Sequence, residues 1–431
     1  MTGSAKTTMR YGDPNAMLEQ AAGLFGLCQG RNSTINRLTG KMPTGEGDAL
    51  KKIKGQSSTE LPIVQAKDLG RNRGDEVKFH FVQPVNAFPI MGDEYAEGKG
   101  TGIKIGSDQL RVNQARFPID LGSVMSQIRS PYDLRRLGRP LAKRFMDAYL
   151  DQSILVHLAG ARGFHYNQEW CLPTEAHPKF AQMMVNRVKA PTKNRHFMAD
   201  GDAITGFAAS AGAMGITTAD QLTMEVVDAI ATHMDQIELP PPPVKFEGDE
   251  AAEDSPIRVL LCSPAQYNQF AKSTQFRSMQ ASALARASNA KQHPIFRVDA
   301  GLWSNTLIIK MPKPIRFYAG DTIRYCSAYD SEAETSCVVP DSFGTNFAVD
   351  RALLLGGQAL AQAWAASEHS GMPFFWSEKD LDHGNRLELL IGAILGSSKI
   401  RWGVEGTNGL EFTDHGVAAI DTAVPIIGAR K

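Results

Sequence analysis

The residues of this chain best suited to nucleophilic chemistry are a cysteine and a serine. Cys171 stands between His165 and His177, and a histidine close to a cysteine can withdraw its proton to give a reactive thiolate. Such a pair depends on proximity in space rather than in sequence, so a buried thiol is the favoured interpretation of Cys171. Ser263 follows Cys262 without the Gly-x-Ser-x-Gly frame of a nucleophile elbow. A cytoplasmic hydrolase that uses Cys171 or Ser263 is therefore a remote alternative.

The residues closest to a metal-binding cluster are Asp380, Asp382 and His383. All three stand in one short segment, whereas metal ligands must converge on one point, so a solvated turn is favoured. The sequence also lacks H-E-x-x-H, the helical zinc-binding motif. We therefore expect no metal site.

Glycine-rich segments are the remaining candidates, because glycine loops can surround phosphates. Gly40-Lys41 is followed by Met42 and lacks the upstream glycine of a P-loop. The run from Gly98 to Gly102 has the spacing of a dinucleotide-binding turn, but no helix start follows, so a hairpin tip is favoured. The sequence thus predicts no catalytic residue and no cofactor, and we expect the protein not to be an enzyme.

The composition is typical of a globular protein of about two or three domains. The chain has 431 residues, 42% of them hydrophobic and 21% charged, and 46 Lys and Arg balance 46 Asp and Glu. This balance excludes a basic nucleic-acid-binding surface over the whole protein. The sequence has neither an apolar run of about 18 residues nor the apolar core of a signal peptide, so we expect a cytoplasmic protein without a membrane segment. Reduced, mostly buried thiols are predicted for the five cysteines, Cys28, Cys171, Cys262, Cys326 and Cys337.

Residues 1–73 are rich in Gly, Ser, Thr, Lys and Arg and are expected to form an arm. One helix is predicted within the arm, with Asp13 as its N-cap and Pro14 as its first residue, and it reaches Cys28. Residues 30–61 have almost no apolar periodicity, so they cannot bury enough surface to fold alone. The arm therefore needs another surface to lie against.

A two-stranded excursion is predicted after the arm. Apolar and polar residues alternate over 77–81 and again over 110–112, which indicates two strands. Residues 92–102 between them are rich in glycine and in charge, as at the tip of a hairpin. Because an isolated ribbon is only marginally stable in water, a neighbouring subunit is its expected support.

The strongest helix signal lies after this ribbon. Ser130 is the expected N-cap and Pro131 the first helical residue, and the helix is expected to reach about His157. Pro140 lies inside it and is expected to bend it or to separate two pieces. The predicted core stripe consists of Leu134, Leu137, Leu141, Phe145 and Ala148.

Shorter elements complete a mixed α+β pattern. The capping box Thr218-x-x-Gln221 predicts a helix whose core face carries Leu222, Val226 and Ile230. Residues 239–255, proline-rich and then acidic, are expected to form a solvated loop. The other predictions are strands at 257–261, 306–311, 386–395, 399–402 and 417–420 and helices at 264–271 and 277–288.

Without a catalytic constellation, and with an arm and a ribbon that need support, the chain is interpreted as a structural protein that contacts copies of itself. The aromatic run Phe374, Phe375 and Trp376 is expected to fill a core or a subunit contact.

Several strings of the sequence, taken in order, carry a likeness to a known family. They are GDEVKFHFVQPV, DQLRVNQARFPIDLG, SPYDLRRLGRPLAKRFMDAYLDQSILVHLAGARG, VDRALLLGGQALAQAWA, WSEKDLDHGNRLELLIGAILGSSKIRW and GVAAIDTA. In these strings and their order the chain resembles the major capsid proteins of tailed bacteriophages, which have the Hong Kong 97-like (Johnson) fold. Residues 165–345 match only in general character.

The resemblance implies a division of the chain, here given by residue numbers. It comprises an N-terminal arm (1–73), an extended loop formed by a β-hairpin (74–122), a peripheral domain with a long spine helix (123–204), an axial domain (205–372) and returning strands of the peripheral domain (373–431).

The resemblance also implies a function and partners. Copies of the chain would assemble in the host cytoplasm as pentamers and hexamers into an icosahedral virion shell that encloses double-stranded DNA without sequence-specific binding. A scaffolding protein and a portal are expected partners, and a decoration protein is a further one. Some family members crosslink subunits through a lysine of the extended loop, but Lys99 and Lys104 are ordinary surface lysines here, so we predict no crosslink. The alternative with the same fold is an encapsulin-like cellular compartment with a protein cargo.

Overall fold

The fold is described from a computed structural model of the chain. The structure describes residues 38, 60–66, 76–82, 89–91, 97, 105–130, 132–245, 257–271, 301–311, 313–365, 373–406 and 409–426. The predicted helices at 13–28 and 277–288, the hairpin tip at 92–102 and nearly all of the arm before residue 60 lie outside these residues. No helix within them is both long enough and apolar enough to cross a membrane.

The larger of the two main sheets has eight strands in the order β10-β11-β9-β15-β21-β5-β6, with β12 also paired to β15. At its centre β15 (Phe347–Leu355) and β21 (Val417–Pro425) run antiparallel along their whole lengths. Both are buried almost throughout, which explains their nearly continuous apolar sequences. The other strands are β5 (His196–Asp200), β6 (Ala203–Gly206), β9 (Arg258–Cys262), β10 (Gly301–Trp303), β11 (Thr306–Lys310) and β12 (Arg316–Phe317).

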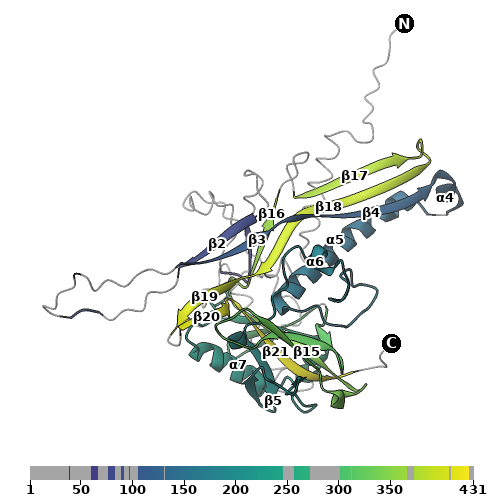
Figure 1. Ribbon diagram of the computed structural model, residues 1–431. Helices are drawn as coiled ribbons and strands as arrows, with labels where there is room; N and C mark the ends of the chain where they lie inside the picture. The colour runs from purple at the N-terminus through teal and green to yellow at the C-terminus, as the bar shows by residue number, and fades with distance from the viewer. Residues whose placement is uncertain are drawn as a thin grey trace, which may run out of the picture.

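Two helices cover one face of this sheet, α7 (Met224–Gln236) and α8 (Pro264–Ala271), where they form one core cluster with Leu260, Ile308 and Ile420 (Figure 1). The bounds of α8 confirm the prediction. The start predicted for α7 is wrong, because the cap is Thr223, whose side chain accepts a hydrogen bond from the amide of Val226. Thr218 lies instead in a turn closed by Asp220.

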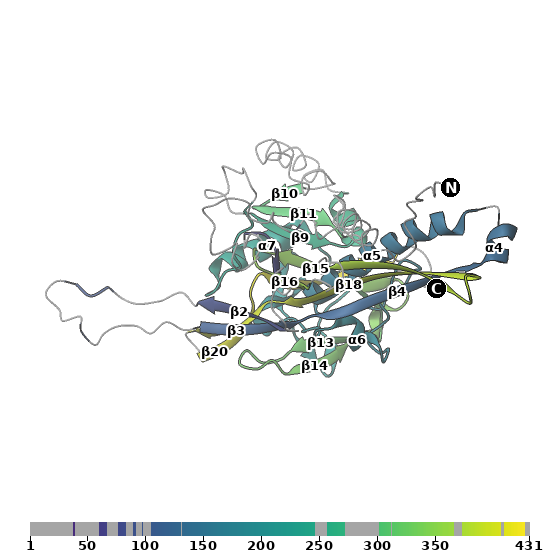
Figure 2. The same ribbon diagram turned by 90° about the horizontal axis from the view of Figure 1, so that it is seen from above.

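The second main sheet has five strands, in the order β1-β16-β18-β17 with β4 also paired to β18. Its central strand is β18 (Arg386–Lys399), and α5 (Leu134–Ala159) runs along one of its faces (Figure 2). The rings of Phe117 and Phe145 stack at this contact with their centres 3.6 Å apart. The remaining strands are β1 (Ile63–Ala66), β4 (Asn113–Ser123), β16 (Leu360–Trp364) and β17 (Phe374–Leu381).

The helix α5 begins later than predicted. Asp133 rather than Ser130 is its N-cap and accepts a hydrogen bond from the amide of Arg136 at 3.1 Å. Ser130 instead ends the short helix α4 (Val124–Arg129), which the sequence analysis did not foresee. Pro140 lies inside one helix rather than between two pieces, and Gly160, with φ of 67°, ends it.

The predicted core stripe of α5 is wrong in its first half. Leu137 and Leu141 are 48% and 58% exposed, whereas Ala142 and Met146 are buried. The reason is that the first turns of α5 lie at the rim of the sheet, where Gly138 rather than a large side chain faces Leu121. Only farther along α5 do the apolar side chains face the core.

The strands of the excursion are confirmed as β2 (Glu76–Val82) and β3 (Ile105–Arg111), which pair antiparallel and point away from the body (Figures 1 and 2). Within residues 1–73 the structure adds β1, which pairs in parallel with β16. The predicted C-terminal strands are confirmed as β18, β19 (Arg401–Gly406) and β21, and β20 (Gly409–Asp414) lies beside β19. A four-stranded sheet holds β7 (Ala209–Ser210), β8 (Ala213–Met214), β13 (Thr322–Cys326) and β14 (Glu334–Val338), and the short helices are α6 (Phe180–Met184), η2 (Lys193–Arg195) and η4 (Asp341–Phe343).

Where β3 passes into β4, the backbone lies very close to that of β18. A Cβ atom placed on Gly396 of β18 would lie 1.9 Å from the carbonyl oxygen of Arg111, so only glycine fits. We expect Gly396→Ala to lower the free energy of unfolding by about 1–3 kcal/mol or more, because the backbone of Arg111 must move. Urea unfolding of the unassembled subunit measures this. Gly206→Ala is the control, because open space surrounds that position, and an equal loss in both variants would contradict the prediction.

Candidate functional site: buried ion pairs and exposed apolar faces

The predicted nucleophiles do not form a hydrolytic site. Cys171 is partly exposed, burial raises the pKa of its thiol, and its sulfur lies 3.9 Å from the carbonyl oxygen of Glu169. The Nδ1 atom of His165 lies 3.1 Å from the hydroxyl of Tyr318, so this histidine has a different partner. A raised thiol pKa disfavours the thiolate that nucleophilic attack requires.

Ser263 has a structural role. Its side chain is buried, and its hydroxyl donates to Asp350 at 2.5 Å and accepts from the amide of Gln266 at 3.2 Å. Ser263 therefore satisfies the first amides of α8 as an N-cap does. A hydroxyl enclosed in this way offers no access to a substrate.

The prediction of a solvated turn is confirmed for Asp382 and His383, whereas Asp380 is an exposed residue of β17 that pairs with Leu387 of β18. Asp382 and His383 have φ values of 53° and 51° and connect β17 to β18 in an exposed hairpin turn. Among the described residues, no three or more His, Cys, Asp or Glu side chains are grouped so that they could hold a metal ion.

The aromatic run before this turn packs as predicted. Phe374 and Trp376 are buried in the main core, and the ring of Phe375 lies over Gly392. Of the cysteines, Cys262, Cys326 and Cys337 are buried free thiols, Cys171 is a partly exposed free thiol, and Cys28 lies outside the described residues.

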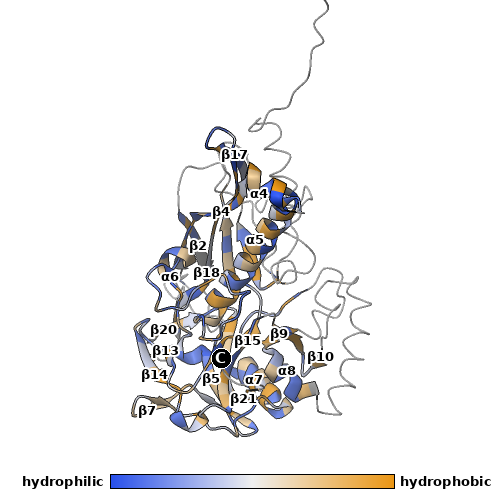
Figure 3. Cartoon of the chain, turned by 90° about the vertical axis from the view of Figure 1, so that its right-hand side faces the viewer, coloured by the Kyte–Doolittle hydropathy of each residue, from blue (hydrophilic) through white to orange (hydrophobic). Residues whose placement is uncertain are grey.

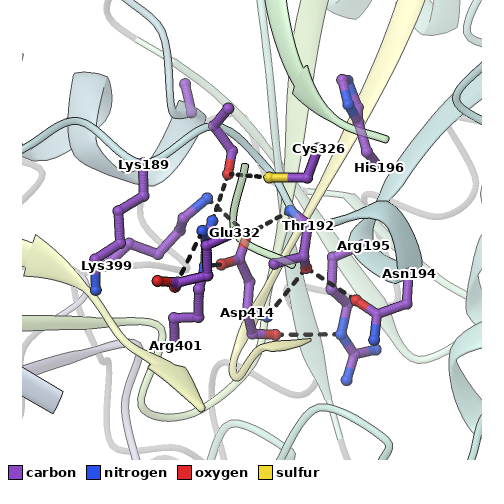
Figure 4. A network of polar contacts seen from close by, with 12 residues as sticks. Lys189, Thr192, Asn194, Arg195, His196, Cys326, Glu332, Lys399, Arg401 and Asp414 are labelled. Atoms are coloured by element: carbon purple, nitrogen blue, oxygen red, sulfur yellow. Dashed lines mark hydrogen bonds and ion pairs between the residues drawn. The ribbon is translucent and has the colours of Figure 1, made fainter. Parts of the chain in front are cut away.

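The chemistry that sequence reasoning missed lies in the interior, in clusters of paired charges. In the first cluster, shown in Figure 4, Asp414 forms ion pairs with Lys399 at 2.6 Å and with Arg401 at 2.8 Å, and all three side chains are almost completely buried. Burial alone would raise the pKa of Asp414, but Arg401 and Lys399 lower it to about 2. Burial lowers the pKa of Lys399 to about 8, against the opposing effect of Asp414.

The same cluster joins the two main sheets. The backbone amide of Thr192 donates to the carboxylate of Asp414 at 3.2 Å, and the guanidinium of Arg195 donates to the Asp414 carbonyl at 3.2 Å (Figure 4). Thr192 and Arg195 lead into β5 of the eight-stranded sheet, whereas Lys399 ends β18 of the five-stranded sheet. The ion pairs therefore fix the two sheets relative to each other.

A second cluster crosses the eight-stranded sheet. Asp421 of β21 binds Arg351 of β15 at 2.7 Å and His196 of β5 at 2.7 Å. Burial would raise the pKa of Asp421, but Arg351 and His196 hold it well below its usual range. Arg351 also donates to the carbonyl of Ala159 at 2.9 Å, which fastens the end of α5 to the sheet.

A signal for these clusters does exist in the sequence. The charged residues interrupt apolar strand sequences, as in FAVDRALLL for Asp350 and Arg351 and in VAAIDTAVP for Asp421. A charge in a fully buried strand must be paired, so such interruptions predict ion pairs, although they do not identify the partners.

On one rim of the molecule, by contrast, apolar side chains are exposed to water. We define the α4–α5 apolar face by six large side chains that are 48% to 71% exposed: Val124, Met125, Ile128, Tyr132, Leu137 and Leu141. Three of them stand on α4, Tyr132 lies between the two helices, and Leu137 and Leu141 belong to the first turns of α5. Figure 3 shows hydrophobic residues in orange on both helices. Six large apolar side chains exposed within 18 residues of the chain indicate an interaction surface.

Comparison with known proteins extends these observations. A family model described as phage capsid protein matches residues 8–426. The chain resembles a capsid structure of Ralstonia phage GP4, with 21% identity over 99% of this chain and 100% of that chain and a TM-score of 0.68. It also resembles a capsid structure of cyanophage Pam1 (13% identity, 85% and 90% of the two chains, TM-score 0.56) and one of Helicobacter pylori bacteriophage KHP30 (12%, 86% and 89%, TM-score 0.52). No curated protein matches the chain.

Proposed function

The chain belongs to the phage capsid protein family, and we propose that its copies assemble as pentamers and hexamers into an icosahedral shell around double-stranded DNA. It is thus a structural component of the virion with a Hong Kong 97-like fold and not an enzyme. The observation that supports the assembly most directly is the α4–α5 apolar face, which the described part of one subunit leaves open to water.

We propose a second copy of the chain as the occupant of this face. Covering its six side chains would contribute on the order of 5–10 kcal/mol. Association itself opposes this with about 4–15 kcal/mol of lost translational and rotational freedom. One such contact is therefore weak, whereas a closed shell in which every copy repeats it is stable. A single copy in solution would keep the face exposed.

The test is a charge placed in the middle of the α4–α5 apolar face. We expect Ile128→Asp combined with Leu141→Asp to reduce particle formation at least about tenfold, because a carboxylate cannot be buried in an apolar contact without a partner. Sedimentation and negative-stain microscopy of the full chain, alone and with its scaffolding protein, measure the yield.

Tyr166→Asp is the matched control, since Tyr166 is exposed to a similar extent outside this face. The double variant must keep the wild-type melting temperature as an unassembled subunit. Normal shells from it would contradict the role of the face, and the absence of particles from the wild-type chain under all conditions would contradict the proposed function.

We propose the domain division as well: an arm at 1–73, an extended loop at 74–122, peripheral segments at 123–204 and 373–431, and an axial domain at 205–372. β21 pairs with β15 and β5 pairs with β21, which favours adding these two strands to the axial unit. The pairing of β16 with β18 favours adding β16 to the peripheral unit.

The contents of the particles distinguish a virus from an encapsulin-like compartment. Nuclease-protected double-stranded DNA in particles from infected cells would support the proposed shell, whereas a co-purified enzyme would support the compartment. The zero net charge favours DNA held without tight binding, because a strongly basic inner wall would bind phosphates through counterion release. We propose a scaffolding protein, a portal and a decoration protein as further partners.

A further inference from the structure

The β2–β3 hairpin leaves the body of the protein at Arg111, the last residue of β3 (Figure 2). At this point a single side chain, that of Asn186, binds both backbone groups of Arg111. The Arg111 amide donates to Asn186 Oδ1 at 2.9 Å, and Asn186 Nδ2 donates to the Arg111 carbonyl oxygen at 2.8 Å. The side-chain amide thus takes the place of a neighbouring strand.

Asn186 is itself fixed to the five-stranded sheet. Its Nδ2 atom donates a second hydrogen bond, of 3.1 Å, to the carbonyl oxygen of Ser397 in β18. Next to Ser397, Gly396 allows the Arg111 carbonyl to pass directly over β18. The junction between the hairpin and the body therefore lies between Gly396 and Asn186.

The backbone that holds Asn186 has an unusual conformation. Val185 has φ of 65° and ψ of −59°, and the Asn186 amide donates to the Met184 carbonyl oxygen at 2.7 Å. This is a γ-turn with a positive central φ, which is rare and strained for a β-branched residue. Such strain persists only where the surroundings impose it, and it is concentrated at functional positions. Here the turn directs the Asn186 side chain at Arg111.

A second contact fixes the direction of the hairpin. Asp108 of β3 binds the ammonium group of Lys189 at 2.8 Å and accepts from the amide of Arg401 at 3.3 Å. Asp108 and Arg111 are three residues apart in β3, and between them Leu110 is buried against Ala361 and Trp402, so β3 is attached to the body at several points. The exposed cross-strand pair of Glu76 and Arg111 contributes little by comparison.

We infer that Asn186 is the residue that positions the β2–β3 hairpin for contact with a neighbouring subunit. The inference rests on the proposed function, because the angle of the hairpin matters only if the hairpin contacts another copy. Since all copies carry the same attachment, each would present its hairpin to the next copy in a similar direction.

Asn186→Ala tests the inference in the full, unassembled chain. We expect the Arg111 amide to exchange with deuterium about tenfold faster, because its acceptor is removed, while amides of the β17–β18 pair and the melting temperature stay unchanged. Asn186→Asp keeps the acceptor for the Arg111 amide but turns a carboxylate oxygen toward two carbonyl oxygens. It is therefore expected to loosen the hairpin as well.

Asn113→Ala is the matched control, because the Asn113 side chain lies two residues beyond Arg111 and bonds only locally to the amide of Gln114. Unchanged exchange over residues 105–111 in Asn186→Ala would overturn the inference. Faster exchange together with a lower yield of closed shells supports it. Faster exchange with a normal yield of shells would confirm the attachment but refute the contribution of the hairpin to assembly.

Discussion

Acidification from pH 6.5 to pH 4 is expected to remove most of the stability of the subunit, because three histidines are buried without charge. Burial lowers the pKa of His157, of His196 and of His415 from 6.5 to about 4. Nearby cations add to this effect, namely Lys189 and Lys399 for His157, Arg351 for His196 and Arg195 for His415. Each shift corresponds to about 3 kcal/mol.

The sign follows from proton binding. The histidines of the unfolded chain bind protons below pH 6.5, whereas those of the folded chain do so only below about pH 4. Protons are therefore taken up on unfolding throughout this window, and the free energy of unfolding falls as the pH falls through it. The buried carboxylates affect stability in a more acidic pH range. The pKa of Asp414 is about 2, so its contribution to the free energy of unfolding is lost only in stronger acid.

Urea unfolding of the unassembled subunit at pH 7, 6, 5 and 4 measures the effect. In His157→Gln, whose amide can still donate to the Met184 carbonyl, the change between pH 6.5 and 4 is expected to shrink by about one third. His383→Gln, in the exposed turn, is the control. A free energy of unfolding that does not change over this window would refute the prediction.

Removing the carboxylate of Asp414 is expected to destabilise the subunit by about 3–5 kcal/mol, because two buried cations would lose their partner. Lys399 and Arg401 both depend on this carboxylate, and Lys399 has almost no contact with water. In Asp414→Ala we also expect the two main sheets to separate at a lower concentration of denaturant. The reason is that the amide of Thr192 loses the carboxylate that accepts its hydrogen bond.

A double-mutant cycle with Lys399→Met shows whether the effect is electrostatic. Asp414→Ala with Lys399→Met is expected to be more stable than Asp414→Ala alone, because one unpaired charge is gone. Asp380→Ala, at an exposed position near the end of β17, is the control for loss of a carboxylate as such. If the two substitutions were simply additive, the charge-pair explanation would fail, and a packing defect would account for the loss.

Much of the fold could be predicted from local sequence. The alternating residues of β2, the proline that begins α8 and the apolar run of β21 are local signals, and each element forms where it was expected. The family resemblance supplied the fold class, which neither periodicity nor composition could supply. From the sequence, Ser263 was a poor nucleophile candidate because it lacks the nucleophile-elbow frame, and the structure adds that its hydroxyl is enclosed.

The errors occurred where local signals compete or where the partner is distant. Ser130 and Asp133 both suit an N-cap, but Ser130 is already used to end α4, so Asp133 begins α5. Leu137 and Leu141 have core periodicity, but the described part of their own subunit leaves them exposed. The pairing of β1 with β16 joins Gln65 to Gln362 by a side-chain hydrogen bond across 297 positions, and no local pattern reports that distance.

The place of β21 in the middle of the eight-stranded sheet has a consequence for how the protein is made. His196 of β5 and Asp421 of β21 are bonded although 225 positions separate them. A ribosome adds about 5–20 residues per second, so β5 waits on the order of 10–45 s for its neighbour. During that time its open edge invites aggregation, which makes nascent chains natural clients of chaperones. A chain that stops before β21 lacks the strand that joins β15 to β5, so we expect it to leave the eight-stranded sheet incomplete.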